Sequence, residues 1–495
     1  MKRSIIFILI ISFAHFSVLK SQEVKRLSLA EVVELSEEQS PDAILAKHRF
    51  RASYWQYRTF KAEYLPSLTL TGVFPEYNRS YEQEYDYSTG SEFYVEKNYS
   101  NISGSLSLSQ NIGMTGGSIF VQSDIRRFDD NVFREDGTWQ YISTPVSIGL
   151  SQPLFRFNEF KWQKQIEPLR YEAAKKTYLE DVENVHLRAV QRFFQLALAQ
   201  INKEIAEMNY SNADTLYRIA QGRYNLGTIA ENELLQMELS FLNAGTARNS
   251  AEINLRDMEL RLRSFLGYNE SIRIELNIPV SIPDIEIDMN KALELATANN
   301  PEILDLQRQL LEASRDVAEA KAEKGLNANM NVSYGLKGDD AKIPGAYQLL
   351  DDQQRLSVSF SVPIVDWGLR RGRYRMAQSS EEVVKTQVRQ SIIDFEQSIF
   401  LDVAQFNLQD DQVRTAAKSD TVAAKMYEVT KQRFLIGNVD VLDLNNADTK
   451  KDENKRAYIQ ALQNYWTYYY NVRRMTLYDF ESDNPLETAF EKLIE

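Results

Sequence analysis

The stretch "RYNLG", residues 223–227, returns 210 residues later as "RFLIG", residues 433–437. Each motif ends a long run of residues with almost no proline, and a second proline-free run follows it. A glycine just past the end of a helix can adopt the left-handed conformation that lets the chain reverse its direction. The two motifs therefore predict two helical hairpins with the same kind of tip.

The duplication extends upstream of the tips. "VSIGLSQPLF", residues 146–155, matches "LSVSFSVPIV", residues 356–365, and the offset of 210 then continues without a gap to the tips. Further upstream, "SLAEVVELSEEQSPDAI" matches "DMNKALELATANNPEIL" at an offset of 260, with Pro41 on Pro301. The chain is therefore an internal duplication with about 50 extra residues in the first copy, between Gly72 and Val146.

The first residues are typical of a secretory signal peptide. Lys2 and Arg3 precede an apolar run from Ile5 to about Leu19, which is shorter than the ~20 apolar residues of a membrane-spanning helix. A membrane anchor is the alternative. We predict this division: signal peptide 1–21; first repeat 22–280, with strands at about 67–155 and a tip near 223–227; second repeat 281–478, with strands at about 328–365 and a tip near 433–437; C-terminal tail 479–495.

Helices of unusual length are expected before each tip. Residues 160–222 and 370–432 would each reach roughly 95 Å as one helix. Apolar side chains recur at coiled-coil spacing in two places, which predicts helices packed along seams. These side chains are Ala251, Leu255, Met258, Leu262 and Phe265, and Ile392, Phe395, Ile399, Val403 and Phe406.

Segments of another kind precede the long helices. Leucine, valine, isoleucine or phenylalanine alternates with serine, threonine or glycine in "SLTLTG", "SGSLSLS", "PVSIGLS" and "LSVSFSV". One apolar face and one face of small uncharged residues are typical of membrane β-barrel strands around a water-filled interior. Residues 76–99 have no apolar stripe and are interpreted as an exterior loop. Residues 115–128 are able to form a further hairpin, so a barrel hairpin and an exterior loop remain open for the extra residues.

Composition disfavours several functions. The net charge of −13 argues against a nucleic-acid partner. The sequence has no cysteine, and neither His48 nor His186 has a second ligand at metal-binding spacing, so each is expected on a helix face. Phosphate-binding loops and nucleophile elbows are also missing from the sequence. We therefore expect no enzymatic activity, no catalytic residues, no metal and no cofactor.

Several short motifs occur in one order. They are "LP" at Leu65, "QPLF" at residues 152–155, "VPIVDWG" at residues 362–368, and the two R-aromatic-x-x-G tips, each with an acid six residues on. In this order and spacing the chain resembles the TolC family of bacterial outer membrane efflux proteins.

The resemblance implies a mainly α fold with membrane β-structure: a homotrimer whose chains share one outer-membrane β-barrel, continued by a periplasmic α-helical tunnel. It also implies a passive exit duct of a tripartite efflux or type I secretion system. The protein would lie in the outer membrane of a Gram-negative bacterium, in contact with lipid. Its partners would be a periplasmic adaptor protein and an inner-membrane pump of the RND or ABC type.

The resemblance also assigns residues. The tips would dock on the adaptor through Arg223, Tyr224, Gly227, Arg433, Phe434 and Gly437. The periplasmic gate would contain Asp443, with Glu233 in the matching place of the first copy. Asn446 stands where the family has a second acid, and Val439 where a basic residue helps to latch the closed state. An alternative for both acids is a plain preference for helix N-termini.

Two other functions are weighed against the exit duct. A periplasmic adaptor-like coiled-coil protein would have long helices without alternating strands, and a free-standing porin would have strands without such long helices. The arginines of "GLRRGRYR", residues 368–375, suit either a solvated helix end or a substrate or lipid site. The sequence does not identify the substrate.

Overall fold

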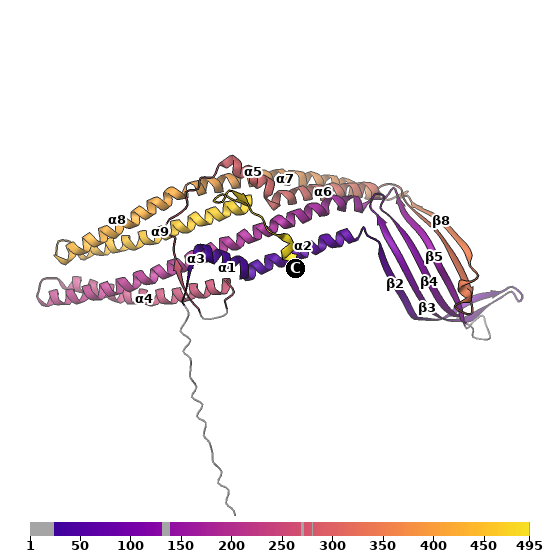
Figure 1. Cartoon of the computed structure of the whole chain (residues 1–495), viewed down its shortest axis with the longest axis horizontal. Coiled ribbons are helices and arrows are strands. Elements are labelled where there is room, and N and C mark those ends of the chain that lie inside the picture. The colour runs from indigo at the N-terminus through magenta and orange to yellow at the C-terminus, as the bar shows by residue number, and fades with distance from the viewer. Residues whose placement is uncertain (1–23, 131–138, 269–271, 280, 495) are drawn as a thin grey trace, which may run out of the picture. The chain divides into compact units, whose positions relative to one another are not determined.

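A computed structural model describes residues 24–130, 139–268, 272–279 and 281–494. The predicted signal peptide lies outside these residues. The chain divides into two compact units, each built from three separate segments (Figure 1). The sheet unit consists of residues 47–179, 293–399 and 487–495, and the tip unit of residues 1–46, 180–292 and 400–486. Both units take segments from each half of the duplicated sequence, and the repeat boundaries stay a prediction.

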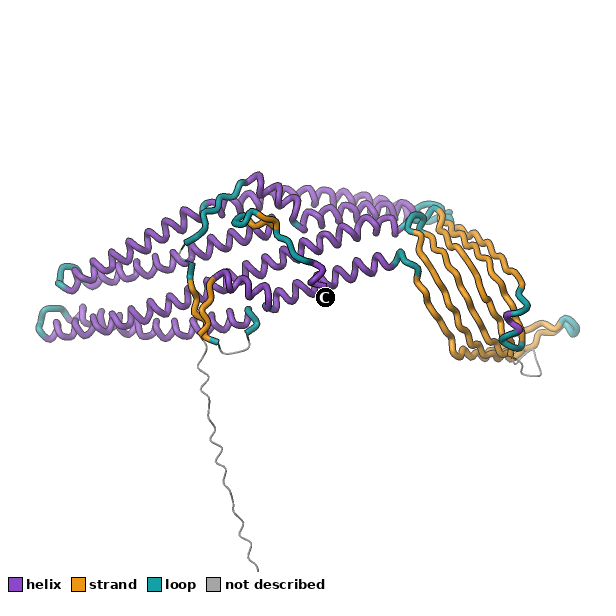
Figure 2. Tube along the Cα trace, viewed as in Figure 1, coloured by secondary structure: helices purple, strands orange, loops and turns teal. Residues whose placement is uncertain are grey.

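The sheet unit contains one antiparallel sheet of six strands, in the order β2-β3-β4-β5-β7-β8 (Figure 2). The strands are β2 Ser67–Asp86, β3 Ser91–Ile112, β4 Gly117–Asp130, β5 Trp139–Leu154, β7 Asn327–Asp340 and β8 Asp351–Ser361. A short 3-10 helix, η1 Gly345–Tyr347, lies in the connection between β7 and β8. Because β5 pairs with β7, the last strand of the first copy lies beside the first strand of the second copy.

One face of this sheet carries an apolar band that crosses all six strands. Residues directly opposite each other on neighbouring strands share a face. The band passes through the pairs Leu68–Leu108, Leu108–Val121, Val121–Ile148, Leu150–Val332 and Val332–Leu356. Leu70 is 76% exposed and Val358 is 54% exposed, so the band is an outward surface rather than a core. The predicted alternation of these strands is confirmed.

The extra residues of the first copy add strands to the sheet. Strand β4 pairs with β3 on one side and with β5 on the other. The first copy therefore contributes four strands and the second copy two. This settles the alternative that the sequence left open in favour of additional strands.

The predicted exterior loop at residues 76–99 is wrong. Strands β2 and β3 stay paired up to Asp86 and Ser91, so only four residues form the turn. The turn is closed by the side chain of Asp86, which accepts from the backbone N–H of Ser88 at 2.8 Å, and by Gly90 at φ 69°. Cross-strand polar pairs such as Arg79 with Glu96 stabilise this part of the hairpin. Polar pairing gives no apolar stripe, and for this reason the sequence pattern did not reveal the strands.

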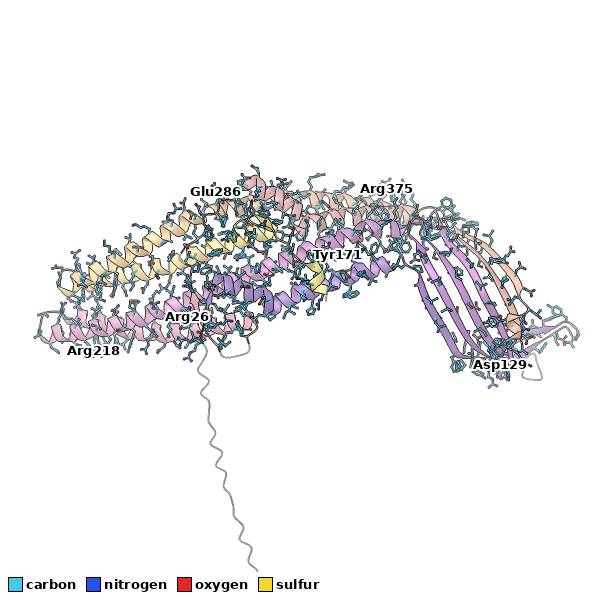
Figure 3. All side chains as sticks on the ribbon, viewed as in Figure 1. Arg26, Asp129, Tyr171, Arg218, Glu286 and Arg375 are labelled. Carbon is cyan, nitrogen blue, oxygen red and sulfur yellow. The ribbon has the colours of Figure 1, made fainter. Side chains whose placement is uncertain are left out.

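The helices start where prolines predicted them. Helix α2 spans Pro41–Ala62 and α6 spans Pro301–Glu323. Ser40 Oγ accepts from the N–H of Ala43 at 3.1 Å, and the Asn300 side chain accepts from that of Glu302 at 2.9 Å. In the sheet unit α2 packs on the first part of α3, Glu159–Asn225, through aromatic rings. Tyr57 stacks on Tyr171, labelled in Figure 3, with 4.5 Å between ring centroids.

The tip unit is built from two helical hairpins (Figure 1). The first consists of the last part of α3 and α4 Glu231–Phe265, and the second of α8 Gln409–Leu435 and α9 Val441–Thr476. The remaining elements of the chain are β1 Val24–Ser28, α1 Leu29–Gln39, β6 Arg273–Asn277, α5 Met289–Asn299, α7 Leu369–Asn407, β9 Tyr478–Asp479, β10 Asn484–Pro485 and α10 Phe490–Ile494. Among the described residues, no helix is both long and apolar enough to cross a membrane.

The predicted apolar seams are largely buried. Leu262 is fully buried and Leu255 is 7% exposed in α4. In the second seam Phe395, Ile399, Val403 and Phe406 are buried, whereas Ile392 is 37% exposed. Ala251, Met258 and Phe265 of the first seam are half-buried, so the first seam is buried only in part, whereas the second packs as expected from Phe395 onward.

The two long helices differ, although the sequence predicted the same length for both. Helix α3 is continuous, whereas its counterpart is interrupted at Leu408 between α7 and α8. Asn407 exchanges two hydrogen bonds with the backbone of Ile287, at 3.0 and 3.1 Å, and Gln409 Nε2 donates to the Gln405 carbonyl that a regular helix would use. Residues 407–409 correspond to residues 197–199 of the first copy, which are Ala-Leu-Ala. These residues have no polar side chain that could compete for the backbone hydrogen bonds of the helix.

Candidate functional site at the helical tips

Both tips end their first helix in the same way. Gly227 has φ 71° and Gly437 has φ 79°. After Gly227, the N–H of Thr228 donates to the Arg223 carbonyl at 2.9 Å; after Gly437, the N–H of Asn438 donates to the Arg433 carbonyl at 2.9 Å. The N–H group of Gly227 donates to the Tyr224 carbonyl, and that of Gly437 donates to the Phe434 carbonyl. This pair of bonds defines a Schellman motif, so the predicted glycine-dependent reversal is confirmed at both tips.

Arg223 connects the two tips to each other. Its Nη2 donates to the Leu435 carbonyl at 3.0 Å, and its guanidinium lies 5.9 Å from the ring centroid of Phe434. Arg433, at the matching position, is exposed. The two arginines, for which the resemblance implies one role, therefore have different surroundings: Arg223 is half-buried and contacts the other tip, whereas Arg433 is exposed.

An apolar base lies beneath the tips. Ala220, Met237 and Val441 form a buried cluster that joins both hairpins, and Phe434 packs against it. A cleft of about 440 Å³ opens beside this cluster and is lined by residues of both tips, including Arg223 and Glu233. Farther from the tips, Asn212 Nδ2 donates to Tyr427 Oη at 3.2 Å and Asn209 Nδ2 to Asp452 at 2.6 Å. The two hairpins are thus held together as one body.

Each tip exposes a large aliphatic side chain, and the second tip also exposes part of Leu435, at 39%. Leu226 is 80% exposed and Ile436 is 71% exposed, and both stand directly before the tip glycine. The resemblance assigned docking to the arginine, the aromatic residue and the glycine of each tip, and not to this aliphatic pair. The signal was available, since an aliphatic residue recurs at the same place in the two copies. Exposed aliphatic side chains at equivalent positions form a small apolar surface that suits contact with another protein.

The predicted gate acids lie in different surroundings. Asp443 is exposed in the first turn of α9, where its backbone N–H donates to the Asp440 side chain at 2.8 Å. Asn446 is exposed one turn further on. Glu233 is half-buried and lines the cleft between the tips. Asp443 and Asn446 therefore share the outer face of α9, opposite the buried residues Val441 and Leu444, and Glu233 does not belong to that set.

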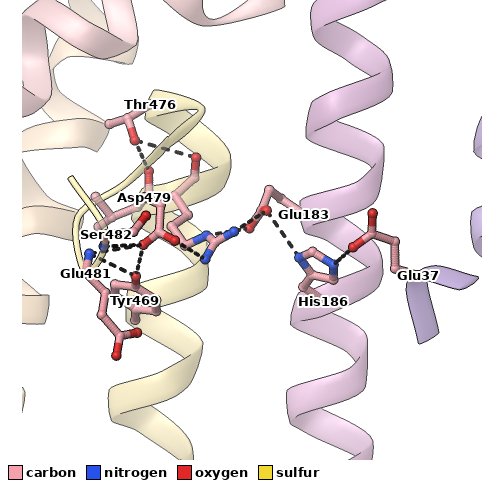
Figure 4. A network of polar contacts seen from close by, with 10 residues as sticks. Glu37, Glu183, His186, Tyr469, Thr476, Asp479, Glu481 and Ser482 are labelled. Atoms are coloured by element: carbon pink, nitrogen blue, oxygen red, sulfur yellow. Dashed lines mark hydrogen bonds and ion pairs between the residues drawn. The ribbon is translucent and has the colours of Figure 1, made fainter. Parts of the chain in front are cut away.

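A buried ion network lies in the same unit, and the sequence analysis did not foresee it (Figure 4). Glu183 of α3 is 2% exposed and accepts two hydrogen bonds from Arg473 of α9, at 2.9 and 3.1 Å. Arg473 also contacts Asp479 at 3.2 Å, and Asp479 accepts from the hydroxyl of Tyr469 at 2.5 Å. On the other side, His186 lies 3.1 Å from Glu183 and 3.2 Å from Glu37 of α1. The network connects α1, α3, α9 and the segment after α9.

His186 is held in its charged form by this network. Burial lowers the pKa of His186, but the hydrogen bonds to Glu183 and Glu37 outweigh burial and raise the pKa to about 9. The hydrogen bond from His186 lowers the pKa of Glu37. Both histidines lie on helix faces as predicted, His48 exposed on α2 and His186 buried on α3.

The raised pKa predicts a pH dependence of stability. An unfolded histidine titrates near 6.5, so protonated His186 stabilises the fold fully below about pH 6.5, and this contribution is lost as the pH rises through about 9. The shift corresponds to roughly 3 kcal/mol. The stability difference between the wild type and His186→Gln, measured by urea unfolding, should therefore shrink from pH 6.5 to 9. His48→Gln is the control and should show no such change; a constant difference for His186→Gln would contradict the assignment.

The arginines after the second copy's last strand border a cleft in the sheet unit. Arg370 and Arg373 line a space of about 700 Å³ together with Arg156 and the acids Glu319 and Glu323. Arg370 also donates to the Glu323 carbonyl at 2.9 Å. The space thus carries charges of both signs, and Arg375, labelled in Figure 3, is not among its lining residues.

An outward apolar band on an antiparallel sheet, combined with two long helical hairpins, defines an outer-membrane channel with a helical extension. The family model described as "Outer membrane efflux protein" matches residues 134–268 and 292–476. The chain belongs to this family, and the TolC-like resemblance of the sequence is confirmed. The protein is therefore an outer-membrane efflux channel that extends into the periplasm. The family forms trimers and works with adaptor and pump partners.

Solved structures of outer-membrane channels have the same fold. The Campylobacter jejuni CmeC channel matches with a TM-score of 0.66 and 16% identity, over 94% of this chain and 88% of that one. VceC from Vibrio cholerae matches with a TM-score of 0.58 and 11% identity, over 93% of this chain and 97% of that one. The open state of the Neisseria gonorrhoeae MtrE channel matches with a TM-score of 0.51 and 15% identity, over 93% of this chain and 91% of that one. No curated protein matches the sequence significantly.

Proposed function

We propose that the chain is the passive exit duct of a tripartite exporter, that it docks on a periplasmic adaptor through its two tips, and that it performs no chemistry of its own. The inner-membrane partner is a pump of the RND or ABC type. The observation that carries this proposal is the pair of equivalent tips, each of which ends in a Schellman motif and exposes an aliphatic residue directly before the glycine, Leu226 or Ile436.

The tips suit a helical partner. Leu226 and Ile436 are apolar anchors of the kind that an adaptor's helical hairpin buries in a groove. Arg433 beside them is exposed and offers a charge to the rim of such a contact. Arg223 stabilises the paired tips from within, through the Leu435 carbonyl. The proposed docking surface therefore consists of Leu226, Ile436, Arg433 and the exposed Tyr224, with Phe434 at its base.

The adaptor-like alternative is disfavoured by the sheet. Six strands with an apolar band on one outward face are typical of a membrane barrel and are not expected in a periplasmic adaptor. A free-standing porin is disfavoured by α3, which has 67 residues. Both features together support a duct that crosses the outer membrane and continues toward a pump.

The docking role predicts the effect of removing the apolar anchors. The double variant Leu226→Ser with Ile436→Ser should weaken binding of the purified adaptor from the same organism by at least about tenfold, because burying one leucine contributes roughly 1.5–3 kcal/mol. Trimer yield should stay at the wild-type level, since both side chains are exposed. Binding is measured by surface plasmon resonance on the detergent-extracted channel.

Two arginine variants complete the test. Arg433→Ala should weaken adaptor binding without changing the thermal stability of the tips. Arg223→Ala should lower the thermal stability of the tips, because it removes the hydrogen bond from Arg223 to the Leu435 carbonyl. Wild-type affinity in both the double serine variant and Arg433→Ala would refute docking at the tips.

A further inference from the structure

The two copies of the duplication contribute unequally to the sheet. The second copy supplies one hairpin, β7–β8, whereas the first supplies two, β2–β3 and β4–β5. Two single hairpins would give this sheet four strands per chain, but the described residues give it six. The extra hairpin leaves the number of strands even, so the chain still enters and leaves the sheet at the end that adjoins the helices.

The turn between β3 and β4 is fixed to the helices at that end. The Asn158 side chain donates to the Gly113 and Met114 carbonyls at 3.2 and 3.0 Å, and Gln152 donates to the Thr115 carbonyl at 3.0 Å. Next to the turn, Asn111 donates to the Glu63 carbonyl at 3.0 Å. Side chains from β3, from β5 and from Asn158, just before α3, thus hold this turn in place. The extra hairpin is an integral part of the sheet.

Strand β4 also continues both faces of the sheet. Val121 lies in the apolar band, opposite Leu108 on β3 and Ile148 on β5. On the other face Phe120 covers Gly149, where an added Cβ would meet the ring at 2.2 Å. An aromatic ring over a cross-strand glycine fixes the pairing of β4 with β5. The band therefore requires β4 to lie at the same membrane depth as its neighbours.

Among the residues that the structure describes, none pairs with the outer sides of the two edge strands, β2 and β8. All 11 residues of β8 are exposed, and so are the first 11 residues of β2. In lipid an unpaired strand edge costs several kcal/mol per backbone group, so both edges need partners. A strand of 11 residues tilted by 45° spans roughly 26 Å, the height of a membrane band. The first 11 residues of β2 thus offer an edge as long as β8, and the remaining residues of β2 extend beyond it.

Their side-chain patterns match as well. On β2 the even-numbered residues Leu68 and Leu70 are apolar, and Thr69 between them is polar. On β8 the even-numbered Val358 is likewise apolar, and the odd-numbered Ser359 is polar. Antiparallel pairing of β8 with β2 of another copy then keeps the apolar band continuous. A slip by one residue would turn the band of one strand to the wrong face.

We infer that three copies close one barrel of eighteen strands, six from each chain, in which β8 of one chain pairs with β2 of the next. The inference rests on the trimer of the proposed function. Barrel diameter grows about linearly with strand number, so this barrel is about 1.5 times as wide as the twelve-stranded barrel that two single hairpins per chain would give. Barrels of 16–18 strands leave an aqueous channel.

Disulfide trapping tests the edge pairing, and the absence of native cysteine leaves only the introduced thiols. Thr69→Cys is combined in turn with Ser357→Cys, Ser359→Cys and Ser361→Cys, which covers registers that differ by two residues. On oxidation at least one pair should give covalent dimers and trimers on a non-reducing gel. The control, Thr69→Cys with Val358→Cys, places the thiols on opposite faces and should stay at background. Background levels in all three test pairs would overturn the pairing.

Strand number is tested on the wild-type protein by electron cryo-microscopy of the detergent-extracted trimer. Eighteen strands around one pore support the inference. A trimer with twelve strands would overturn it and leave the exit duct intact. A protein that does not form trimers would overturn the proposed function and the inference together.

Discussion

Glu183→Gln should lower the free energy of unfolding by about 3–5 kcal/mol, the usual loss when one partner of a buried ion pair is removed. Glu183 is 2% exposed and accepts both close hydrogen bonds that Arg473 donates toward α3. Without the Glu183 carboxylate, Arg473 stays buried with Asp479 as its remaining charged partner. His186 loses one of the two carboxylates that it contacts and keeps Glu37. The glutamine keeps the shape of the side chain, so the loss reports on charge. Urea unfolding followed by circular dichroism measures it.

The neighbouring ion pair offers a matched control. Glu180 lies one turn earlier on α3, is 25% exposed and contacts Arg474 of α9 at 3.2 Å. Since partly exposed pairs contribute at most about 1 kcal/mol, Glu180→Gln should be much milder. A loss below 1 kcal/mol for Glu183→Gln, or equal losses for the two variants, would show that the network does not hold these segments together.

Asp443→Ala should reduce the preference of the channel for cations about fivefold. If the three copies of Asp443 in a trimer form the ring that we propose, three charges at several ångströms from a passing ion would contribute on the order of 1 kcal/mol in water. Its position on the exposed face of α9 is compatible with a pore-lining role. Reversal potentials in planar bilayers under a salt gradient measure the preference, and block by multivalent cations from the periplasmic side should weaken in parallel.

Asn446→Asp is the reciprocal variant for the same face. It adds a second acid three residues after Asp443, so cation preference and multivalent block should both increase. Glu233→Gln should have a smaller effect, because Glu233 lines the cleft between the tips and does not share the exposed face of α9. Wild-type selectivity in both Asp443→Ala and Asn446→Asp would place the gate elsewhere.

Local chemistry made part of this molecule predictable. The reversal at Gly227 and Gly437 depends on a few consecutive residues, and so do the caps at Ser40 and Asn300. The alternation of Leu68 and its neighbours has the period of a strand, so it identified the membrane face without knowledge of the partner strands. The comparison of the two copies then gave the order of the elements.

Features that depend on distant residues were not predictable. Glu183 and Arg473 are 290 positions apart, and neither stands out in its own helix. The interruption at Leu408 depends on Ile287, which docks on Asn407 from another segment. Arg223 and Arg433 have the same sequence surroundings but different contacts, because only one of them meets the other tip. Symmetry in the sequence therefore did not extend to the roles of equivalent side chains.

The central claim is that three chains together form one conducting duct. Six strands form an open sheet in the single chain, and both edges have to be paired before the sheet encloses a pore. The most direct test combines sedimentation equilibrium of the detergent-extracted protein with single-channel recording of the same fractions. The account predicts a trimer and conductance only in the trimer fraction. A monomer that conducts ions, or a trimer that does not, would contradict it.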